Sequence, residues 1–154
     1  GTYIRKLAHD ISLSMGVKGN MIQLVRTQVG PFNDSNWHSL HDLKDAYEFF
    51  KEGDETKLRK IIVPIEFAVQ HLPRIWVFDS TVDTLCHGAD LSIPGISKLD
   101  DYIEEGDLVS IFTLKGELIC LGTALITGKK MYKNKTGKAV KTNKVFMERK
   151  TYSN

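Results

Sequence analysis

The stretch LPRIWVFDSTVDTLCHGADLSIPGI, residues 72–96, marks the point at which the chain changes character. Its first part, RIWVF, is rich in β-branched and aromatic residues, which are typical of strands. The segment from Asp79 to Gly88 begins with a residue favoured as a helix N-cap and ends in glycine, which predicts one short helix. The following DLSIPGI predicts a strand or loop interrupted by Pro94 and Gly95.

Further strands are expected downstream of this stretch. DLVSIFT and ELICLGTALIT, residues 107–113 and 117–127, read as two strands joined by a two-residue hairpin turn at Lys115-Gly116. KAVKTNKVFME, residues 138–148, reads as the last strand. Five short strands, with one helix among them, predict a small β-barrel over residues 73–154.

Helical patterns dominate the upstream half, residues 1–72. The first few residues read as the end of a strand that turns into an amphipathic helix, which stops at Gly16. Residues 20–30 alternate like a strand and end at Gly30-Pro31, and Ser39 with Asp42 predicts a loosely capped helix. Short helices broken around Pro64 follow, so the whole chain is expected to be α+β.

Composition excludes several classes of protein. The chain has 154 residues, of which 42% are hydrophobic and 26% charged, as in an ordinary globular protein. No apolar run reaches the roughly 18 residues that a membrane helix needs. Cys86 and Cys120 form no CxxC pair and are expected to be packing residues. The five histidines show no zinc-like spacing with cysteine or carboxylate, so we expect no metal site.

Charge is distributed unevenly along the chain. Residues 79–117 carry nine acidic side chains and two basic ones, whereas residues 118–154 carry nine basic side chains and one acidic one, Glu148. Such segregation is typical of a nucleic-acid-binding face, although a solvated lysine-rich hairpin would give the same pattern. The basic stretch 128–144 is expected to lie on the connection into the final strand.

Two blocks of motifs resemble the TruB/dyskerin family of pseudouridine synthases. The first block contains GTYIR at residues 1–5, Leu7-Ala8, Asp10-Ile11 and Met15-Gly16. It continues with Met21, Leu24, Arg26 and the GPF of residues 30–32. The second comprises residues 72–96, 106–127 and 145–152, and it resembles the PUA domain of that family. LHDL at residues 40–43 is similar to the archaeal and eukaryotic branch, which works with H/ACA guide RNAs.

The resemblance implies a fragment that carries part of an active site. Residues 1–72 would be the C-terminal part of a catalytic domain, whose nucleophilic aspartate belongs to a motif absent from this chain, so we expect the chain alone to be inactive. Tyr3 would stack on the uracil, Arg5 would pair with the aspartate and Leu24 would pack beside the base. Alternate residues of a strand share a face, which would place Tyr3 and Arg5 in one cleft.

The resemblance also implies an RNA-binding surface in the PUA half. The expected groove takes the lower stem and 3′ ACA of a guide RNA, and Asp90 stands where the family usually has a basic residue. The basic stretch would supply phosphate contacts. The residues predicted to bind RNA are Gly88, Ala89, Leu91, Pro94, Gly95, Lys129, Lys130, Lys133 and Arg149.

Partners follow from the same resemblance: an H/ACA guide RNA, a substrate rRNA or tRNA, and the small H/ACA core proteins. No cofactor is implied, because the isomerisation passes no electrons to a carrier. The location would be cytoplasmic in an archaeon and nucleolar in a eukaryote. Two alternatives stay open. One is a non-catalytic RNA-binding module, and the other, disfavoured by LHDL and the PUA block, is a stand-alone tRNA synthase of bacterial type.

Overall fold

A computed structural model describes residues 2–152 of the chain, so Gly1 of the GTYIR motif lies outside the described residues. The contacts divide the chain into two compact units, Gly1–Asn36 and Trp37–Asn154. The domain boundary at residues 72 and 73 predicted from composition falls inside the second of these units. Within residues 2–152, no helix is both long and apolar enough to cross a bilayer.

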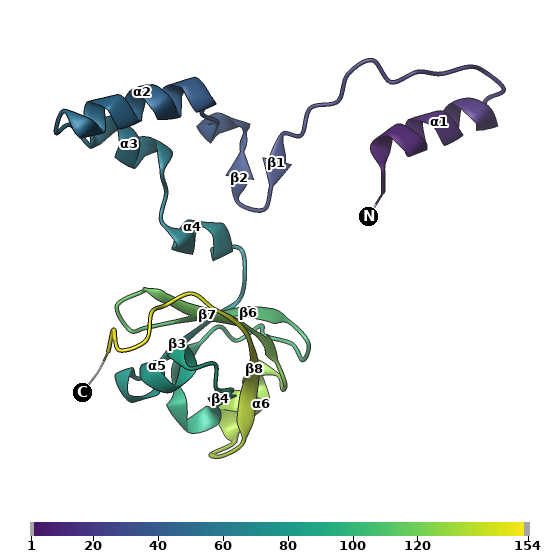
Figure 1. The fold of residues 1–154 in the computed structure, drawn as a ribbon. Coiled ribbons are helices and arrows are strands. Elements are labelled where there is room, and N and C mark those ends of the chain that lie inside the picture. The colour runs from purple at the N-terminus through teal and green to yellow at the C-terminus, as the bar shows by residue number, and fades with distance from the viewer. Residues whose placement is uncertain (1, 153–154) are drawn as a thin grey trace. The chain divides into compact units, whose positions relative to one another are not determined.

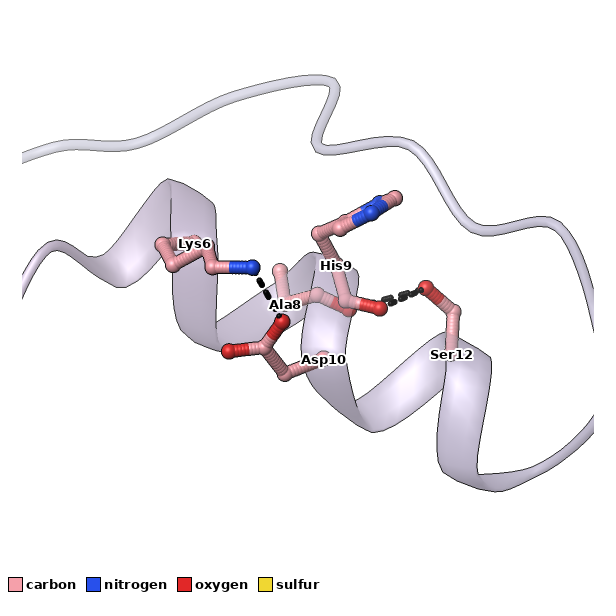
Figure 2. Close-up of polar contacts among 5 residues, drawn as sticks. All are labelled: Lys6, Ala8, His9, Asp10 and Ser12. Carbon is pink, nitrogen blue, oxygen red and sulfur yellow. Dashed lines mark hydrogen bonds and ion pairs between the residues drawn. The ribbon is translucent and has the colours of Figure 1, made fainter.

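The first unit is built around helix α1, Ile4–Ser14, as the apolar spacing predicts. Lys6 Nζ and Asp10 Oδ1 form an ion pair of 2.7 Å one turn apart, and Ser12 Oγ donates to the carbonyls of Ala8 and His9 (Figure 2). Gly19 lies against Ser12, since a Cβ atom at position 19 would come within 2.5 Å of the Ser12 Cβ. The segment after the helix therefore folds back onto it at a glycine.

Two expected strands of this unit are wrong. Residues 2 and 3 are irregular, and so are residues 18–27, where the alternation had predicted a strand. Only a short ribbon forms, between β1, Gln28–Val29, and β2, Phe32–Asn33, with Gly30 at φ +56° in its turn. Alternation alone could not create a strand at residues 20–27, because a strand needs a neighbouring strand to accept its hydrogen bonds.

The second unit begins with three helices. Helix α2, Leu40–Lys51, follows the 3₁₀ turn η1, Asp34–Asn36, and has the capping box predicted from Ser39 and Asp42. The Ser39 side chain accepts from the Asp42 backbone N–H, and the Asp42 carboxylate accepts from the Ser39 N–H. These hydrogen bonds hold the pKa of Asp42 below its usual value. The break at Pro64 is also confirmed, between α3, Thr56–Ile61, and α4, Ile65–Val69.

The remainder forms a six-stranded, nearly closed barrel-like sheet (Figure 1). Its strands in spatial order are β4 (Leu91–Ser92), β8 (Lys138–Val145), β7 (Leu118–Ala124), β6 (Leu108–Phe112), β3 (Arg74–Val77) and β5 (Ile96–Leu99). Only β3 and β6 run parallel, and the other neighbouring pairs are antiparallel. The chain is therefore α+β, with the small β-barrel predicted from the sequence.

Helix α5, Asp79–Cys86, contributes Val82 and Leu85 to the core of this barrel. The strands supply the other core side chains, among them Ile75, Ile111 and Ile119, which are completely buried. Both cysteines belong to the same core, which confirms that they are packing residues. Burial raises the pKa of the Cys120 thiol to about 12.

Three details of the barrel differ from expectation. The N-cap of α5 is Phe78 rather than Asp79, which lies in the first turn instead. The β6–β7 hairpin has a longer loop than two residues, with a Gly116 N–H to Thr113 carbonyl bond and Gly116 at φ +88°. A helix, α6, Gly128–Lys133, forms the first part of the basic connection, where the sequence analysis had predicted no helix.

Helix α4 is attached to the barrel by both apolar and polar contacts. Val69 and Leu72 pack against Phe112 and Leu118, the two residues that pair across the end of the β6–β7 hairpin. Glu66 Oε1 accepts a hydrogen bond of 3.0 Å from the backbone N–H of Leu118, which is itself buried. This helix is therefore a structural part of the barrel unit, although it precedes the first barrel strand.

We expect Glu66→Ala to lower the free energy of unfolding of the barrel unit by about 1–3 kcal/mol, because it leaves the buried Leu118 N–H without an acceptor. Glu66→Gln is the matched control, since its amide oxygen can still accept this bond. Chemical denaturation followed by circular dichroism measures the difference. Equal stability of the two variants would show that the hydrogen bond contributes nothing.

Candidate nucleic-acid interface

A groove of about 770 Å³ opens between helix α6 and residues 93–99 of the barrel. Its apolar lining includes Ile93, Ile96 and Met131. Lys98, Lys129, Lys133 and Lys135 surround it, and Asp101 is its one acidic side chain. A concave surface that combines an apolar floor with a basic rim has the chemistry required to bind the bases and phosphates of a nucleic acid.

Helix α6 forms one wall of the groove, and its residues are of two kinds, buried ones that attach it to the barrel and exposed ones. Gly128 and Met131 are buried, and a Cβ atom at position 128 would lie 3.2 Å from the Asp100 carbonyl oxygen, so the helix approaches the end of β5 closely. The Thr127 hydroxyl caps the helix by accepting from the Lys130 N–H. Lys129 and Lys133, spaced i and i+4, line the groove too, but they are exposed.

The other wall carries part of the predicted RNA-binding set. Pro94 lines the groove, and it lies in the 3₁₀ turn η2, Ile93–Gly95. Gly95 is held against α5, because a Cβ atom there would come within 2.8 Å of both Thr81 side-chain branches. Leu91 is completely buried in the core, so its side chain is not available to RNA. The structure thus brings Pro94, Lys129 and Lys133 together and gives Gly95 and Leu91 packing contacts.

Gly88 and Ala89 form the end of helix α5. The N–H of Gly88 donates to the Leu85 carbonyl and that of Ala89 to the Thr84 carbonyl, with Gly88 at φ +86°. This is the Schellman arrangement, which favours glycine at the left-handed position. No atom lies within 4 Å of a Cβ built at Gly88, so the position is open to solvent. The left-handed backbone at the end of α5 therefore explains why residue 88 is glycine without any role in RNA binding.

Asp90 attaches this turn to strand β8. Its carboxylate accepts from Lys138 Nζ at 2.7 Å and from the Thr142 N–H at 3.3 Å, while the Thr142 hydroxyl donates to the Ala89 carbonyl at 2.7 Å. The hydrogen bond from Lys138 is the main cause that holds the pKa of Asp90 below its usual value. An acidic residue at this position therefore fastens the loop, and the partner lysine is supplied by β8.

We expect Gly88→Ala to lower the free energy of unfolding by roughly 1–2 kcal/mol, the cost of a left-handed backbone for a residue with a Cβ atom. Gly88→Asn should cost less, because asparagine tolerates this conformation. Thermal unfolding of both variants checks the order. If both melt like the unchanged chain, the positive φ angle is not what requires glycine here.

The remaining predicted residues lie elsewhere. Lys130 belongs to α6 but does not line the groove, and Arg149 is exposed beyond the end of β8. Sequence analysis missed Lys98, Lys135 and Tyr132, which do line it. The spacing of Tyr132 from Lys129 would have indicated a shared face only if residues 128–133 had been assigned to a helix.

The predicted catalytic residues belong to the first unit. Tyr3 is the N-cap of α1 and 84% exposed, Arg5 lies in the first helical turn, and Leu24 lies in the irregular segment and is 58% exposed. The argument that Tyr3 and Arg5 share one face of a strand is therefore wrong, because Arg5 is helical. Among residues 2–152, neither side chain has a hydrogen bond or ion pair, so both are free to meet groups from outside this chain.

Comparison with protein families matches both halves of the chain. A model of the tRNA pseudouridylate synthase B C-terminal domain matches residues 5–70, and a model of the PUA domain matches residues 73–146. The chain belongs to the TruB/dyskerin family. The nearly closed barrel with its groove is the family's PUA domain, and the helices before it come from the TruB C-terminal region.

Relatives in this family are closely similar along the whole chain. A probable tRNA pseudouridine synthase B of Methanopyrus kandleri is 52% identical over 153 residues, which are 99% of this chain and 45% of that protein. The corresponding protein of Pyrococcus horikoshii is 51% identical, over 99% of this chain and 46% of that protein. The chain therefore spans about half the length of the curated relatives it matches.

Solved structures of H/ACA particles contain chains of the same fold. A chain of the archaeal box H/ACA sRNP Nop10-Cbf5 complex matches with a TM-score of 0.94 and 49% identity, over 100% of this chain and 50% of that one. A chain of an H/ACA RNP bound to a substrate RNA containing 2′-deoxyuridine matches with a TM-score of 0.90 and 51% identity, over 97% of this chain and 48% of that one. The matched chains of these particles thus contain counterparts of both halves of this chain.

Proposed function

We propose that this chain is the C-terminal portion of an H/ACA pseudouridine synthase, which isomerises uridine to pseudouridine in rRNA or tRNA. The observation that carries the proposal is the match of both halves, in order, to chains found in H/ACA particles at about 50% identity. The PUA domain anchors the guide RNA, and the helical half contributes to the active site.

In this proposal the residues of the first unit complete a site whose nucleophile lies in another part of the enzyme. An aspartate attacks the target uridine, the glycosidic bond breaks, and the base rotates and bonds again through carbon. Tyr3 stacks its ring on the uracil, and Arg5 orients the aspartate and keeps it ionised through a planar, permanently charged guanidinium. Leu24 packs beside the base. The exposure of Tyr3 and Leu24 in this chain supports such roles.

The proposed partners are an H/ACA guide RNA, the substrate RNA and small H/ACA core proteins. Support for the core proteins comes from relatives, since a Cbf5-Nop10-Gar1 complex contains a chain with 50% identity and a TM-score of 0.92. Support for guide binding comes from the basic groove of the PUA domain. A gel-shift comparison of an ACA-ended guide hairpin with a scrambled end tests the proposal directly, and equal affinity for both would contradict specific guide anchoring.

Lys129 and Lys133 are expected to contact phosphates, because they alone of the three predicted α6 lysines line the groove. Log K for RNA binding falls as log salt concentration rises, and replacing either lysine by Gln should make this slope about one unit shallower. One phosphate contact and its counterion release are then lost. Lys130→Gln is the matched control on the same helix. Fluorescence anisotropy over a salt series measures the slopes, and a full unit lost in the Lys130 variant would place the phosphate path elsewhere.

A further inference from the structure

Tyr132 lies between the two groove lysines on the outer face of α6. Lys129, Tyr132 and Lys133 are spaced i, i+3 and i+4, and all three line the groove. The Tyr132 side chain is 87% exposed, and within residues 2–152 it makes no hydrogen bond and no ring contact. An exposed aromatic ring thus shares one face of α6 with two lysines at the edge of a concave surface.

The fold does not require this ring. Helix α6 is held instead by Met131, which is 2% exposed and belongs to the barrel core, and by the close approach of Gly128 to residues 99–101. The Gly128 N–H also donates to the Ile103 carbonyl at 2.9 Å. Tyr132 therefore contributes nothing to these contacts, and its exposed ring is available to a ligand.

The chemistry around Tyr132 fits an unpaired nucleotide. A flat ring stacks on the π-face of any base, while flanking lysines attract the phosphates on either side of it. A base inside a duplex is already stacked on its neighbours and offers no free face, so the site discriminates by strandedness. An acidic peptide would satisfy the lysines but would leave the tyrosine ring without a flat partner.

We infer that Tyr132 stacks on an unpaired base of bound RNA while Lys129 and Lys133 hold the adjoining phosphates. The inference rests on the proposed RNA-binding function and adds a residue that selects single-stranded nucleotides. The apolar lining of the groove, including Ile93 and Ile96, lies beside the ring and excludes water from the stacked base.

The test compares Tyr132→Leu with Tyr132→Phe in the 154-residue chain. The probe is a short single-stranded RNA that carries a fluorescent purine analogue, used alone and annealed to its complement. We expect Tyr132→Leu to weaken single-strand binding roughly 5- to 100-fold and to abolish quenching of the analogue, because base–aromatic stacking is lost. Tyr132→Phe should keep both, and duplex affinity and the salt slope should stay unchanged in both variants.

Tyr47→Leu is the matched control, since Tyr47 is a half-exposed tyrosine of helix α2 that does not line the groove. Unchanged binding and quenching in Tyr132→Leu would overturn the stacking role while leaving RNA binding intact. Equal losses in the Leu and Phe variants would overturn it too, because the hydroxyl rather than the ring would then be responsible. Failure of the unmodified chain to bind either RNA would instead remove the proposed function itself.

Discussion

Arg5→Lys in a full-length enzyme that contains this chain is expected to remove most pseudouridine formation and to leave guide-RNA binding intact. Lysine keeps the positive charge but not the planar fork that pairs with a carboxylate at two points. Loss of that pairing should slow single-turnover formation of pseudouridine at least about tenfold, equivalent to ~1.4 kcal/mol of transition-state stabilisation. A guide-RNA gel shift on the same preparation measures binding separately.

The structure makes this experiment interpretable, because Arg5 is exposed on the first turn of α1 and supports no contact within the described residues 2–152. Lys6→Arg is the matched control, since Lys6 pairs with Asp10 and keeps its charge in the variant. A parallel loss of turnover and guide binding would show that Arg5 maintains the fold rather than the nucleophile. Full activity in Arg5→Lys would contradict the assigned role.

Gly122→Val is expected to disrupt the barrel. Gly122 lies at an irregularity in the pairing of β7 with β8, and a Cβ atom there would come within 2.4 Å of Val140 Cγ1 and 2.7 Å of the Lys141 carbonyl oxygen. Backbone cannot move aside as a flexible side chain can, so β7 and β8 must separate. We expect a loss of about 3 kcal/mol or more, which corresponds to a fall in Tm on the order of 10 °C.

Thermal unfolding by circular dichroism measures this loss, and labelling of Cys120 gives an independent reading. Cys120 lies on β7 and is completely buried, so a thiol reagent reaches it only when the barrel opens. Thr123→Val is the matched control on the same strand, because Thr123 is only partly buried and loses just a surface bond from Asn143. If the Gly122→Val variant has the same Tm as the Thr123→Val control, strands β7 and β8 can adjust to a side chain at position 122.

Local signals predicted the elements whose causes are local. Ser39 and Asp42 satisfy each other's backbone groups within one turn, and Gly88 ends α5 because only its own φ angle matters there. The period of apolar residues predicted α1 for the same reason. Segments whose structure depends on a distant partner were less certain. Residues 20–27 alternate, but no strand among the described residues 2–152 pairs with them. Helix α6 depends on the close fit of Gly128 against residues 99–101.

The α+β class, most of the barrel strands, the family and the concentration of positive charge in the C-terminal region could be predicted from the sequence, whereas strand β5 was missed. The tertiary structure alone decided which basic residues share a surface, because Lys98 and Lys133 are far apart in the chain and meet across one groove. It also decided that Asp90 fastens a turn to Lys138, that Leu91 is core, and that α4 belongs with the barrel. Each depends on contacts between distant segments, which periodicity and spacing do not encode.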